Sequence, residues 1–373
     1  MSLYTRLVRP LIFCLDAERA HHLAIGAGSC ADLVLPLVRA ACAVREPRLE
    51  IEIAGIRFSN PIGLAAGFDK SGTAVAALSA LGFGSVEIGS VSLDPSQGNP
   101  KPRLFRLPRD RAIVVHYGLP NDGAAAVAAR LAARKRDCPF AGRKWDSPLG
   151  INIVKTNRGQ GAAPESPDEI IGEYVAAARM LAPCADYLMF NLSCPNTEDG
   201  RDFFADRGNL EACLAALGEV DFARPVFLKV SPRGGIEAIE RLLAAADPHP
   251  FVKGFMFNLP PGKPDNLTTP EAVWRGMPGA VSGTPCAALA NTCIRETFRR
   301  MDKTRHIIVG AGGVFTGAQA YEKIRLGASL VQALTALVYE GPGVVRRIVR
   351  ELAELLERDG VEHVADVVGV DAR

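Results

Sequence analysis

The sequence HIIVGAGGVFTGAQAYEKIRLGASLVQAL, residues 306–334, contains the repeating unit of the fold. It begins with an apolar run that ends in glycines, continues through a segment of helical period at 317–328, and closes with a second apolar run at 330–334. Strands that are apolar on both faces and alternate with helices are typical of a parallel sheet covered by helices. The stretch therefore predicts a strand, a helix and a parallel strand in succession.

The same unit recurs along the chain from Ile51 onward. Segments of helical period, among them 72–82, 167–183 and 235–246, separate the apolar runs, and several open with proline or polar caps and close in glycine. The apolar runs are eight: 62–67, 85–91, 149–154, 187–192, 226–230, 254–258, 306–312 and 330–334. Eight such units in a chain of this length predict an α/β fold of the (β/α)8 TIM barrel class rather than a doubly wound sheet. Residues 101–118, in the long gap between the second and third runs, are predicted to form an excursion on the barrel rim.

Composition and charge exclude several classes of protein. Of 373 residues, 48% are hydrophobic and 23% are charged, which is enough to bury one large core and argues against disorder. The 43 basic and 41 acidic residues give a formal charge of +2, and no dense run of Lys or Arg provides a local basic patch. We therefore expect no nucleic-acid partner.

The cysteines are scattered and give no sign of a metal site. They form no CxxC pair and no His/Cys ligand spacing of the kind that binds zinc. An odd number of cysteines without a disulfide framework indicates reduced thiols in the cytosol. The nine are Cys14, Cys30, Cys42, Cys138, Cys184, Cys194, Cys213, Cys286 and Cys293.

The N-terminal segment, residues 1–44, differs in character from the rest. Its apolar clusters are interrupted by charges, so none approaches the ~20 apolar residues of a spanning helix. The layout of a signal peptide is missing as well. Two amphipathic helices are predicted, at about 4–25 and 29–42, which either pack on the main domain or lie in a membrane interface. We therefore expect a two-helix N-terminal extension, residues 1–44, followed by a barrel domain, residues 45–373.

Polar residues gather after the predicted strands, where the active site of a TIM barrel lies. We expect two lysines, four asparagines and one thiol to share this face: Lys70, Lys229, Asn152, Asn191, Asn196, Asn258 and Cys194. The glycine-rich turn after the seventh strand, with the helix N-terminus that follows, is a candidate phosphate site. Together these features suggest an enzyme that binds flavin mononucleotide (FMN), with Lys229 stabilising the reduced ring. The alternative is that Lys229 extends to solvent from the strand end.

Longer motifs carry a family resemblance. These are NPIGLAAGFDKSG (60–72), GFGSVEIGSVSLDPSQGNPKPRLFRLP (82–108), NLSCPNT (191–197) and IIVGAGGVFTGAQAYEKIRLGASLVQALTAL (307–337). The sequence resembles the dihydroorotate dehydrogenase family over nearly its whole length. LDAERAHHLA, residues 15–24, resembles the N-terminal extension of the quinone-dependent, membrane-associated class 2 enzymes. The resemblance implies FMN as cofactor, a quinone acceptor reached through a tunnel lined by His21 and Arg106, and peripheral membrane association at the cytoplasmic face, or a cytoplasmic protein.

The resemblance also implies roles for individual residues. Cys194 occupies the position of the base that takes the C5 proton of dihydroorotate while hydride leaves C6 for flavin N5. Class 2 relatives normally have serine there, whereas cysteine belongs to class 1; a buried thiol without a chemical role is the alternative. The implied substrate-binding residues are Lys70, Asn191, Asn196 and Asn258. The implied flavin-binding residues are Ala65, Ala66, Gly67, Ser90, Asn152, Asn191, Lys229, Gly283, Gly313 and Thr335.

Three positions depart from the family pattern in the substrate half of the site. Val115 stands where the family has a substrate-binding asparagine, and Phe257 and Leu259 replace hydroxyl residues that flank Asn258. Each loss removes a hydrogen bond usually worth ~1 kcal/mol.

Three functions therefore stay open. The first is a dihydroorotate dehydrogenase of pyrimidine synthesis, and the second is a related FMN oxidoreductase acting on another cyclic or unsaturated compound, which the departures favour. The third is a flavin-binding protein without catalytic activity. The presence of Cys194, Lys70 and Lys229 argues against this last alternative.

Overall fold

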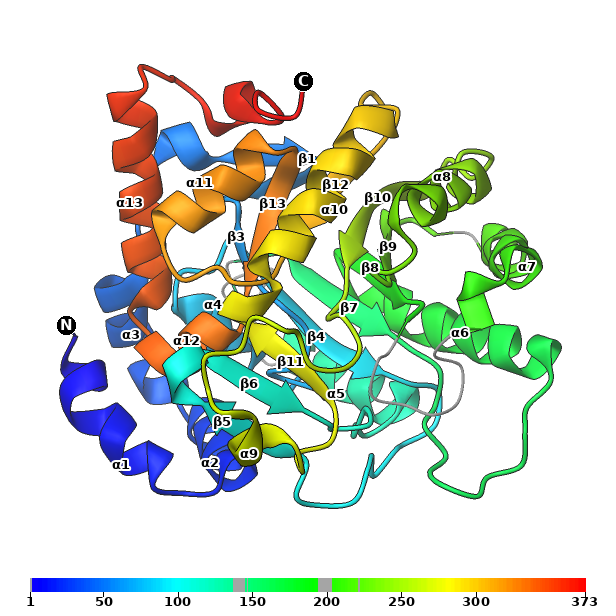
Figure 1. Cartoon of the computed structure of the whole chain (residues 1–373), viewed down its shortest axis with the longest axis horizontal. Helices are drawn as coiled ribbons and strands as arrows, with labels where there is room; N and C mark the ends of the chain where they lie inside the picture. The colour runs from blue at the N-terminus through cyan, green and yellow to red at the C-terminus, as the bar shows by residue number, and fades with distance from the viewer. Residues whose placement is uncertain (1, 137–144, 146, 194–202, 221) are drawn as a thin grey trace.

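A closed barrel of eight parallel strands forms the centre of the molecule (Figure 1). The computed structural model describes residues 2–136, 145, 147–193, 203–220 and 222–373. Each predicted apolar run supplies one barrel strand, and the strands follow one another around the barrel in chain order until Val331 pairs with Ile62 and closes it. The TIM barrel prediction is thus confirmed. The strands are β3 (Ile62–Leu64), β4 (Ser85–Val91), β7 (Leu149–Ile153), β8 (Tyr187–Asn191), β9 (Val226–Val230), β10 (Val252–Phe257), β12 (Ile307–Gly310) and β13 (Ala328–Ala333).

Helices surround the barrel, and the predicted ones at 167–183, 235–246 and 317–328 are confirmed to within a few residues. The first helix of this set has a sharply defined start, because Ser166 and Glu169 form a reciprocal capping box at the N-terminus of α6, with Pro167 in its first turn. The helices are α4 (Val75–Ala80), α5 (Ala124–Arg136), α6 (Pro167–Leu181), α7 (Arg207–Gly218), α8 (Gly235–Ala246), α9 (Glu271–Trp274), α10 (Ala287–Arg300), α11 (Gly317–Arg325), α12 (Thr335–Glu340) and α13 (Val344–Arg358).

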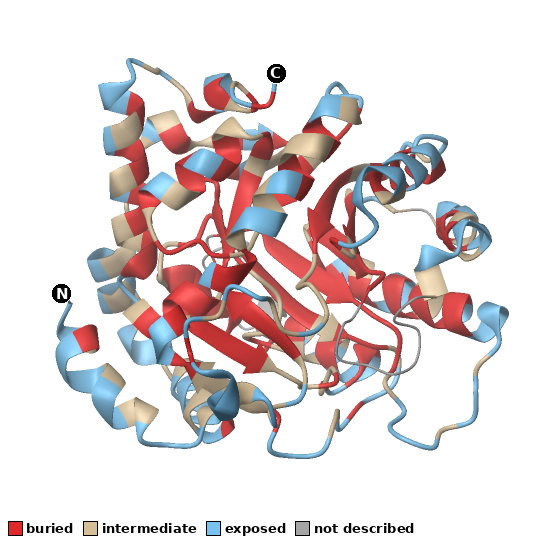
Figure 2. Ribbon diagram, in the orientation of Figure 1, coloured by how far each residue is buried: buried red, intermediate tan, exposed pale blue. Residues whose placement is uncertain are grey.

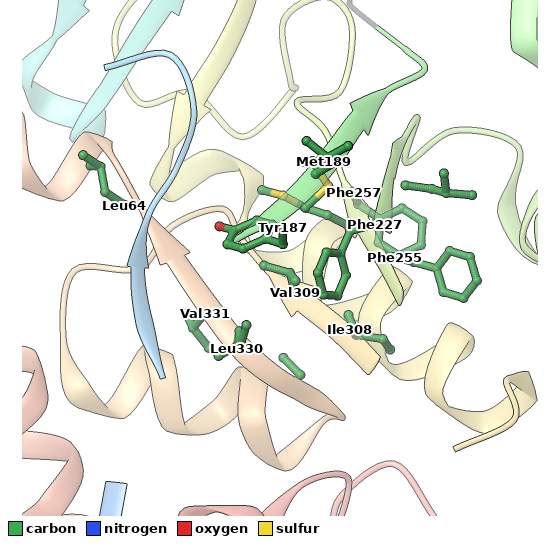
Figure 3. Close-up of a cluster of buried hydrophobic side chains, with 14 of the residues drawn as sticks. Leu64, Tyr187, Met189, Phe227, Phe255, Phe257, Ile308, Val309, Leu330 and Val331 are labelled. Atoms are coloured by element: carbon green, nitrogen blue, oxygen red, sulfur yellow. The ribbon is translucent and has the colours of Figure 1, made fainter. Parts of the chain in front are cut away.

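The barrel strands are buried on both faces (Figure 2). Inside, large apolar side chains from neighbouring strands pack together, as Figure 3 shows for Tyr187, Phe227 and Val309. The rings of Tyr187 and Phe227 meet edge to face with centroids 5.5 Å apart. Continuous apolar runs without alternation are the pattern expected of such doubly buried strands.

Two small antiparallel sheets accompany the barrel. β1 (Ile51–Ile53) and β2 (Ile56–Phe58) form a hairpin. The predicted rim excursion is confirmed as β5 (Leu104–Leu107) and β6 (Ala112–Val115). A third strand, β11 (Ala280–Gly283), joins β6 from a distant part of the chain, and this strand was not among the predicted elements.

The N-terminal segment contains more helices than predicted. A π-helical turn at Tyr4–Val8 leads into α1 (Arg9–Phe13), then α2 (Ala17–Ser29) and, after a 3-10 turn, α3 (Leu35–Cys42). The single helix predicted at 4–25 is wrong because Asp16 is an N-cap, whose Oδ1 accepts hydrogen bonds from the backbone N–H groups of Glu18 and Arg19 at 3.1 and 3.0 Å. In a pattern of hydrophobic periodicity, an aspartate that caps a new helix cannot be told from one on the polar face of a continuous helix.

Side-chain hydrogen bonds fasten this segment to the barrel domain. The Tyr4 hydroxyl donates to the carbonyl of Val338 at 2.8 Å, and Arg9 Nη1 donates to the carbonyl of Tyr339 at 3.1 Å. In Figure 1 the N-terminal helices lie beside the sheet that contains β5 and β6. The extension is therefore packed on the main domain, while the proposed boundary between residues 44 and 45 stays a prediction.

We expect Gly84→Ala to destabilise the protein by about 1–3 kcal/mol or more, because no methyl group fits at this position. Gly84 directly precedes β4, and a Cβ on this residue would lie 1.8 Å from the backbone oxygen of Asn60. The control is Gly172→Ala in α6, where a Cβ meets nothing within 4 Å and alanine should stabilise the helix by about 0.5–1 kcal/mol. Urea unfolding of both variants measures the two opposite shifts; equal midpoints would contradict this account.

Candidate functional site

The carboxyl ends of the barrel strands border a cavity of about 660 Å³. Part of its lining follows the strands and includes Gly67, Asn258 and Gly313. Another part comes from the N-terminal helices and includes His21 of α2 and Val38 of α3. This volume is in the range of small-molecule and cofactor sites. The cavity is thus shared between the barrel and the N-terminal extension.

Most of the residues expected to bind flavin meet at this cavity. Lys229, at the end of β9, is buried and lines it. Ser90, Asn152 and Asn191 are not among its described lining residues, but hydrogen bonds connect them to Asn258, which is. That these residues hold a flavin stays a prediction. The expected residues that line the cavity directly are Ala65, Ala66, Gly67, Lys229, Gly283, Gly313 and Thr335.

The turn after β12 brings glycine backbone to the cavity surface. Gly312 and Gly313 line the cavity, with positive φ angles of 88° and 73°. A Cβ on Gly313 would lie only 2.7 Å from the Cβ of Ala287, so a side chain would also crowd this turn. Exposed amides without side chains are what a phosphate group requires.

Protein groups occupy part of the N-terminus of the helix that follows this turn, α11. The backbone N–H of Gly317, the first residue of α11, donates to the carboxylate of Glu351 at 2.6 Å. The N–H of Gln319 donates to the hydroxyl of the N-cap, Thr316, at 3.2 Å. Two amides at the N-terminus of α11 are therefore bonded within the protein, and the phosphate site at this turn stays a prediction.

The segment predicted to carry the catalytic base follows β8 in the sequence. Cys194 and Asn196 fall in residues 194–202, outside the described residues. Just before them, the carbonyl of Ser193 accepts a hydrogen bond from Asn258 Nδ2 at 2.6 Å, and Asn191 Oδ1 accepts from the same group at 3.0 Å. Ser193, the last described residue before this segment, therefore lies next to Asn258, a predicted substrate-binding residue.

Lys70, a predicted substrate-binding residue, contacts His21 of the predicted quinone tunnel and is not among the described residues that line the cavity. Its ammonium lies 3.4 Å from His21 Nε2 and 3.8 Å from the ring centroid of Tyr117. Burial lowers the pKa of Lys70 to about 7. Burial, followed by the charge of Lys70, lowers the pKa of His21 well below its ordinary value. At neutral pH His21 is therefore uncharged, and Lys70 is close to its midpoint of ionisation.

Arg106, the second residue expected in the tunnel, also lines the cavity. Its Nη1 donates to the carbonyl of Ile12 at 3.2 Å, and its Nη2 donates to the carbonyl of Leu15. The guanidinium lies 4.5 Å from the ring centroid of Phe13. Arg106 thus binds the end of α1, so the structure brings both predicted tunnel residues to one cavity with the predicted flavin residues.

A buried ion pair holds α2 in place beside the cavity. Arg103 Nη2 lies 2.8 Å from Glu18 Oε1, and both side chains are buried. Arg103 Nη1 also donates to the carbonyls of Gln97 and Asn99 at 2.6 and 2.8 Å. Because these hydrogen bonds satisfy the guanidinium, the pair can be buried without leaving a charge unpartnered.

The three departures from the family pattern all face the cavity. Val115 ends β6, paired with Leu104 and Ala280, and lines the cavity. Phe257 and Leu259, on either side of Asn258, line it too. The substrate half of the site is therefore more apolar than the family pattern implies.

The profile of the family described as "Dihydroorotate dehydrogenase" matches residues 48–356. The chain belongs to the dihydroorotate dehydrogenase family. A protein of Sphingopyxis alaskensis named "Dihydroorotate dehydrogenase (quinone)" is 42% identical over 370 residues, covering 98% of this chain and 96% of that protein. One of the same name from Natronomonas pharaonis is 39% identical and matches all of both chains. The similarity therefore extends through the N-terminal segment.

Solved structures of the family have the same fold. DHODH from Eimeria tenella in complex with ferulenol superposes with a TM-score of 0.83 at 30% identity, over 97% of this chain and 99% of that one. The ligand-free form from the same organism gives a TM-score of 0.79 at 31% identity, over 92% of this chain and 98% of that one.

Sequence reasoning missed two polar residues of the barrel interior, Glu87 and Gln332. Both lie in predicted strands, in SVEIGSV (85–91) and LVQAL (330–334), and both are buried. The signal was present, because a carboxylate or amide inside a doubly buried strand needs hydrogen-bond partners in the interior. We did not use it.

Apolar side chains on the N-terminal segment are unusually exposed. Of the thirteen large apolar residues exposed in the described chain, nine lie between Leu3 and Leu37. No single described helix has the length and composition to cross a membrane, although α2 and residues 32–42 meet both criteria together across a 67° bend. Exposed apolar side chains concentrated in one segment make that segment a candidate interaction surface.

We expect Glu18→Ala to loosen α2, because it leaves Arg103 buried without its charge partner, at a cost of about 3–5 kcal/mol. Hydrogen exchange measured by mass spectrometry should show faster exchange of the α2 amides. Glu354→Ala, an exposed position on α13, is the control and should leave the exchange unchanged. Equal protection of α2 in both variants would show that the ion pair does not hold this helix.

Proposed function

We propose that this protein oxidises dihydroorotate to orotate and passes the electrons through a bound flavin to a quinone. The observation that supports this function best is one cavity shared by three sets of residues. Lys229 and the glycine turn belong to the flavin set, Asn258 to the substrate set, and His21 and Arg106 to the quinone set. The family membership over the full chain supports the same reaction.

The residues of the cavity fit FMN. The backbone of Gly312 and Gly313 suits a phosphate, and the buried cation of Lys229 suits the negative charge that a reduced flavin gains. A buried acceptor on the cavity wall, Gln332 Oε1, has no protein partner among the described residues and suits a hydrogen-bond donor of the cofactor. When bound, the flavin supplies the acceptor for hydride.

The chain's own residues bind the substrate and move its proton. Lys70, Asn191, Asn196 and Asn258 bind dihydroorotate through its charged and polar groups. Cys194 takes the proton from C5, a role for which a thiol is suited once its pKa approaches neutrality. The Asn258 amide, held between the Asn191 side chain and the Ser193 carbonyl, fixes the substrate next to the catalytic loop.

The competing function is a related flavin oxidoreductase with a different substrate. Val115, Phe257 and Leu259 support it, because each adds apolar surface to the cavity at a position where the family pattern is polar. Reduction of the bound flavin by dihydroorotate distinguishes the two functions.

The test is anaerobic stopped-flow reduction of the flavin-loaded protein by dihydroorotate, followed as loss of the absorbance of oxidised flavin. We expect rapid reduction by the wild type and a rate lower by about 100-fold or more in Cys194→Ala, since the base is lost. Cys194→Ser should retain more of the rate than Cys194→Ala. Cys213→Ala is the control thiol: burial raises the pKa of Cys213 to about 12, and its removal should not slow the reaction.

The possible outcomes lead to different conclusions. A wild type that dihydroorotate does not reduce, while dithionite does, would reject dihydroorotate oxidation in favour of the second function. Rapid reduction of Cys194→Ala would reject this residue as the base and leave the reaction intact.

The pKa of Lys70 predicts that the affinity for orotate falls as the pH rises through about 7. The ammonium form, present below this pKa, attracts the orotate carboxylate, and the neutral amine above it does not. His21 adds no charge in this range, because its own pKa lies well below its ordinary value. Orotate titrations of the oxidised flavin spectrum from pH 6 to 8 measure this dependence.

Variants isolate the contribution of Lys70. In Lys70→Met the affinity at pH 6 should drop by about tenfold or more and the pH dependence should flatten. Lys303→Met, an exposed position after α10, should behave like the wild type. A Lys70→Met protein that keeps the full pH dependence would assign it to another group.

We propose that the exposed leucines of the N-terminal segment dock the protein on a membrane from which the quinone enters. Leu11→Glu/Leu37→Glu, at two positions more than 70% exposed, should lower binding to phosphatidylcholine–phosphatidylglycerol vesicles by about tenfold or more. Reduction of a membrane quinone should fall with it, while reduction of the flavin by dihydroorotate should not. Ile236→Glu on α8 is the matched control, and unchanged vesicle binding of the double variant would reject the docking surface.

A further inference from the structure

A carboxylate is buried without solvent contact in the middle of the barrel. Glu87 of β4 is 0% exposed. Three other strands each provide a donor: Asn152 Nδ2 of β7 at 3.0 Å, the Tyr187 hydroxyl of β8 at 3.2 Å and Gln332 Nε2 of β13 at 2.7 Å. A buried carboxylate requires such donors, since it has lost its hydration. Glu87 therefore fixes one end of each of these three side chains.

The contact with Asn152 determines the direction of a chain of hydrogen bonds. Because an ionised carboxylate only accepts, the NH2 group of Asn152 faces Glu87 and its Oδ1 faces Ser90. The Ser90 hydroxyl must then donate to Asn152, which it does at 2.5 Å, and its oxygen accepts from Asn191 Nδ2 at 3.3 Å. Asn191 Oδ1 in turn accepts from Asn258 Nδ2 at 3.0 Å. Every donor in this chain points toward Glu87.

The contact with Gln332 determines what the barrel presents to the cavity. Its Nε2 is used by Glu87, so its Oε1 is the free end. That oxygen is buried and has no hydrogen-bond partner among the described residues, and Gln332 is 3% exposed and lines the cavity. A buried acceptor without a donor costs free energy of folding, so we expect a bound molecule to donate a hydrogen bond to this oxygen.

We propose that Glu87 is a positioning residue that sets the polarity of the ligand site, turning the oxygen of Gln332 toward the bound flavin and aligning the amides of Asn152, Asn191 and Asn258. The inference rests on the proposed function in that the ligand is a flavin. Glu87 itself does not line the cavity among the described residues, so it acts through these four side chains. Its charge, rather than its size, is what they require.

Glu87→Gln tests this requirement because it keeps the shape and removes the charge. The new amide can still accept from Asn152, but its own NH2 then faces the NH2 of Gln332. Gln332 must turn over and present a donor to the cavity in place of an acceptor. We expect the dissociation constant for FMN, measured by fluorescence quenching as apoprotein is reconstituted, to rise by about tenfold or more.

The exchange of the two side chains provides the rescue. In Glu87→Gln/Gln332→Glu, the amide at position 87 accepts from Asn152 and donates to the carboxylate at position 332, whose other oxygen again faces the cavity. Gln332→Glu alone sets two carboxylates 2.7 Å apart, the present Nε2–Oε2 distance, and should bind FMN poorly. We expect the double variant to bind FMN at least about threefold more tightly than either single variant.

Controls separate positioning from stability. Glu173→Gln changes another buried carboxylate, which accepts from the Thr156 backbone at 2.7 Å and does not line the cavity, and should leave FMN affinity unchanged. Tyr187→Phe removes one donor to Glu87 without reversing any partner, so its effect on FMN affinity should stay within about threefold. If Glu87→Gln does not fold, Gln332→Leu, which leaves Glu87 in place, should still lower FMN affinity by about fivefold or more.

The outcomes distinguish this inference from the proposed function. Unchanged FMN affinity in Glu87→Gln, or a double variant no better than the single ones, would overturn it. A wild type that binds FMN but is not reduced by dihydroorotate would overturn the proposed function alone, since FMN affinity does not depend on the substrate. A wild type that binds no FMN would overturn both.

Discussion

The pairing of β13 with β3 closes the barrel, and this closure determines how its interior and its cavity are built. Once the eight strands form a ring, polar groups inside have no access to water and must find partners on neighbouring strands. Glu87 meets this requirement with donors from three other strands. The same closure places all the strand ends, and the polar side chains that follow them, around one cavity.

The fold could be predicted from the sequence because its signal is repetitive. Eight doubly apolar runs and intervening helical segments specify a barrel even when individual boundaries are off by up to three residues. The wrong helix boundaries lie where one residue is compatible with two structures. Asp16 fits the polar face of a continuous helix in the sequence, but it caps the start of α2 in the structure. β11 was missed because a strand of four residues, AVSG, gains its identity from β6, a partner about 165 residues away along the chain.

The site could be predicted only as far as strand ends and family motifs reach. Lys229, Asn258 and Gly313 meet as expected, since the topology alone brings strand ends together. The contact between Lys70 and His21 could not be foreseen, because it depends on how the N-terminal helices pack against the rim. The hydrogen bond from the Gly317 N–H to Glu351 could not be predicted either, because it joins two helices, α11 and α13, that meet only after the barrel has closed.

The residues that line the cavity show that the N-terminal segment and the barrel domain depend on one another. Ala20, Ala24 and Val38 belong to the N-terminal segment, and Leu78, Leu104 and Val115 to the barrel domain, yet all six face the same space. Neither part could keep these side chains from water alone. A barrel separated from its extension would carry an open apolar groove at the carboxyl ends of its strands, so its solubility is tied to the first forty residues.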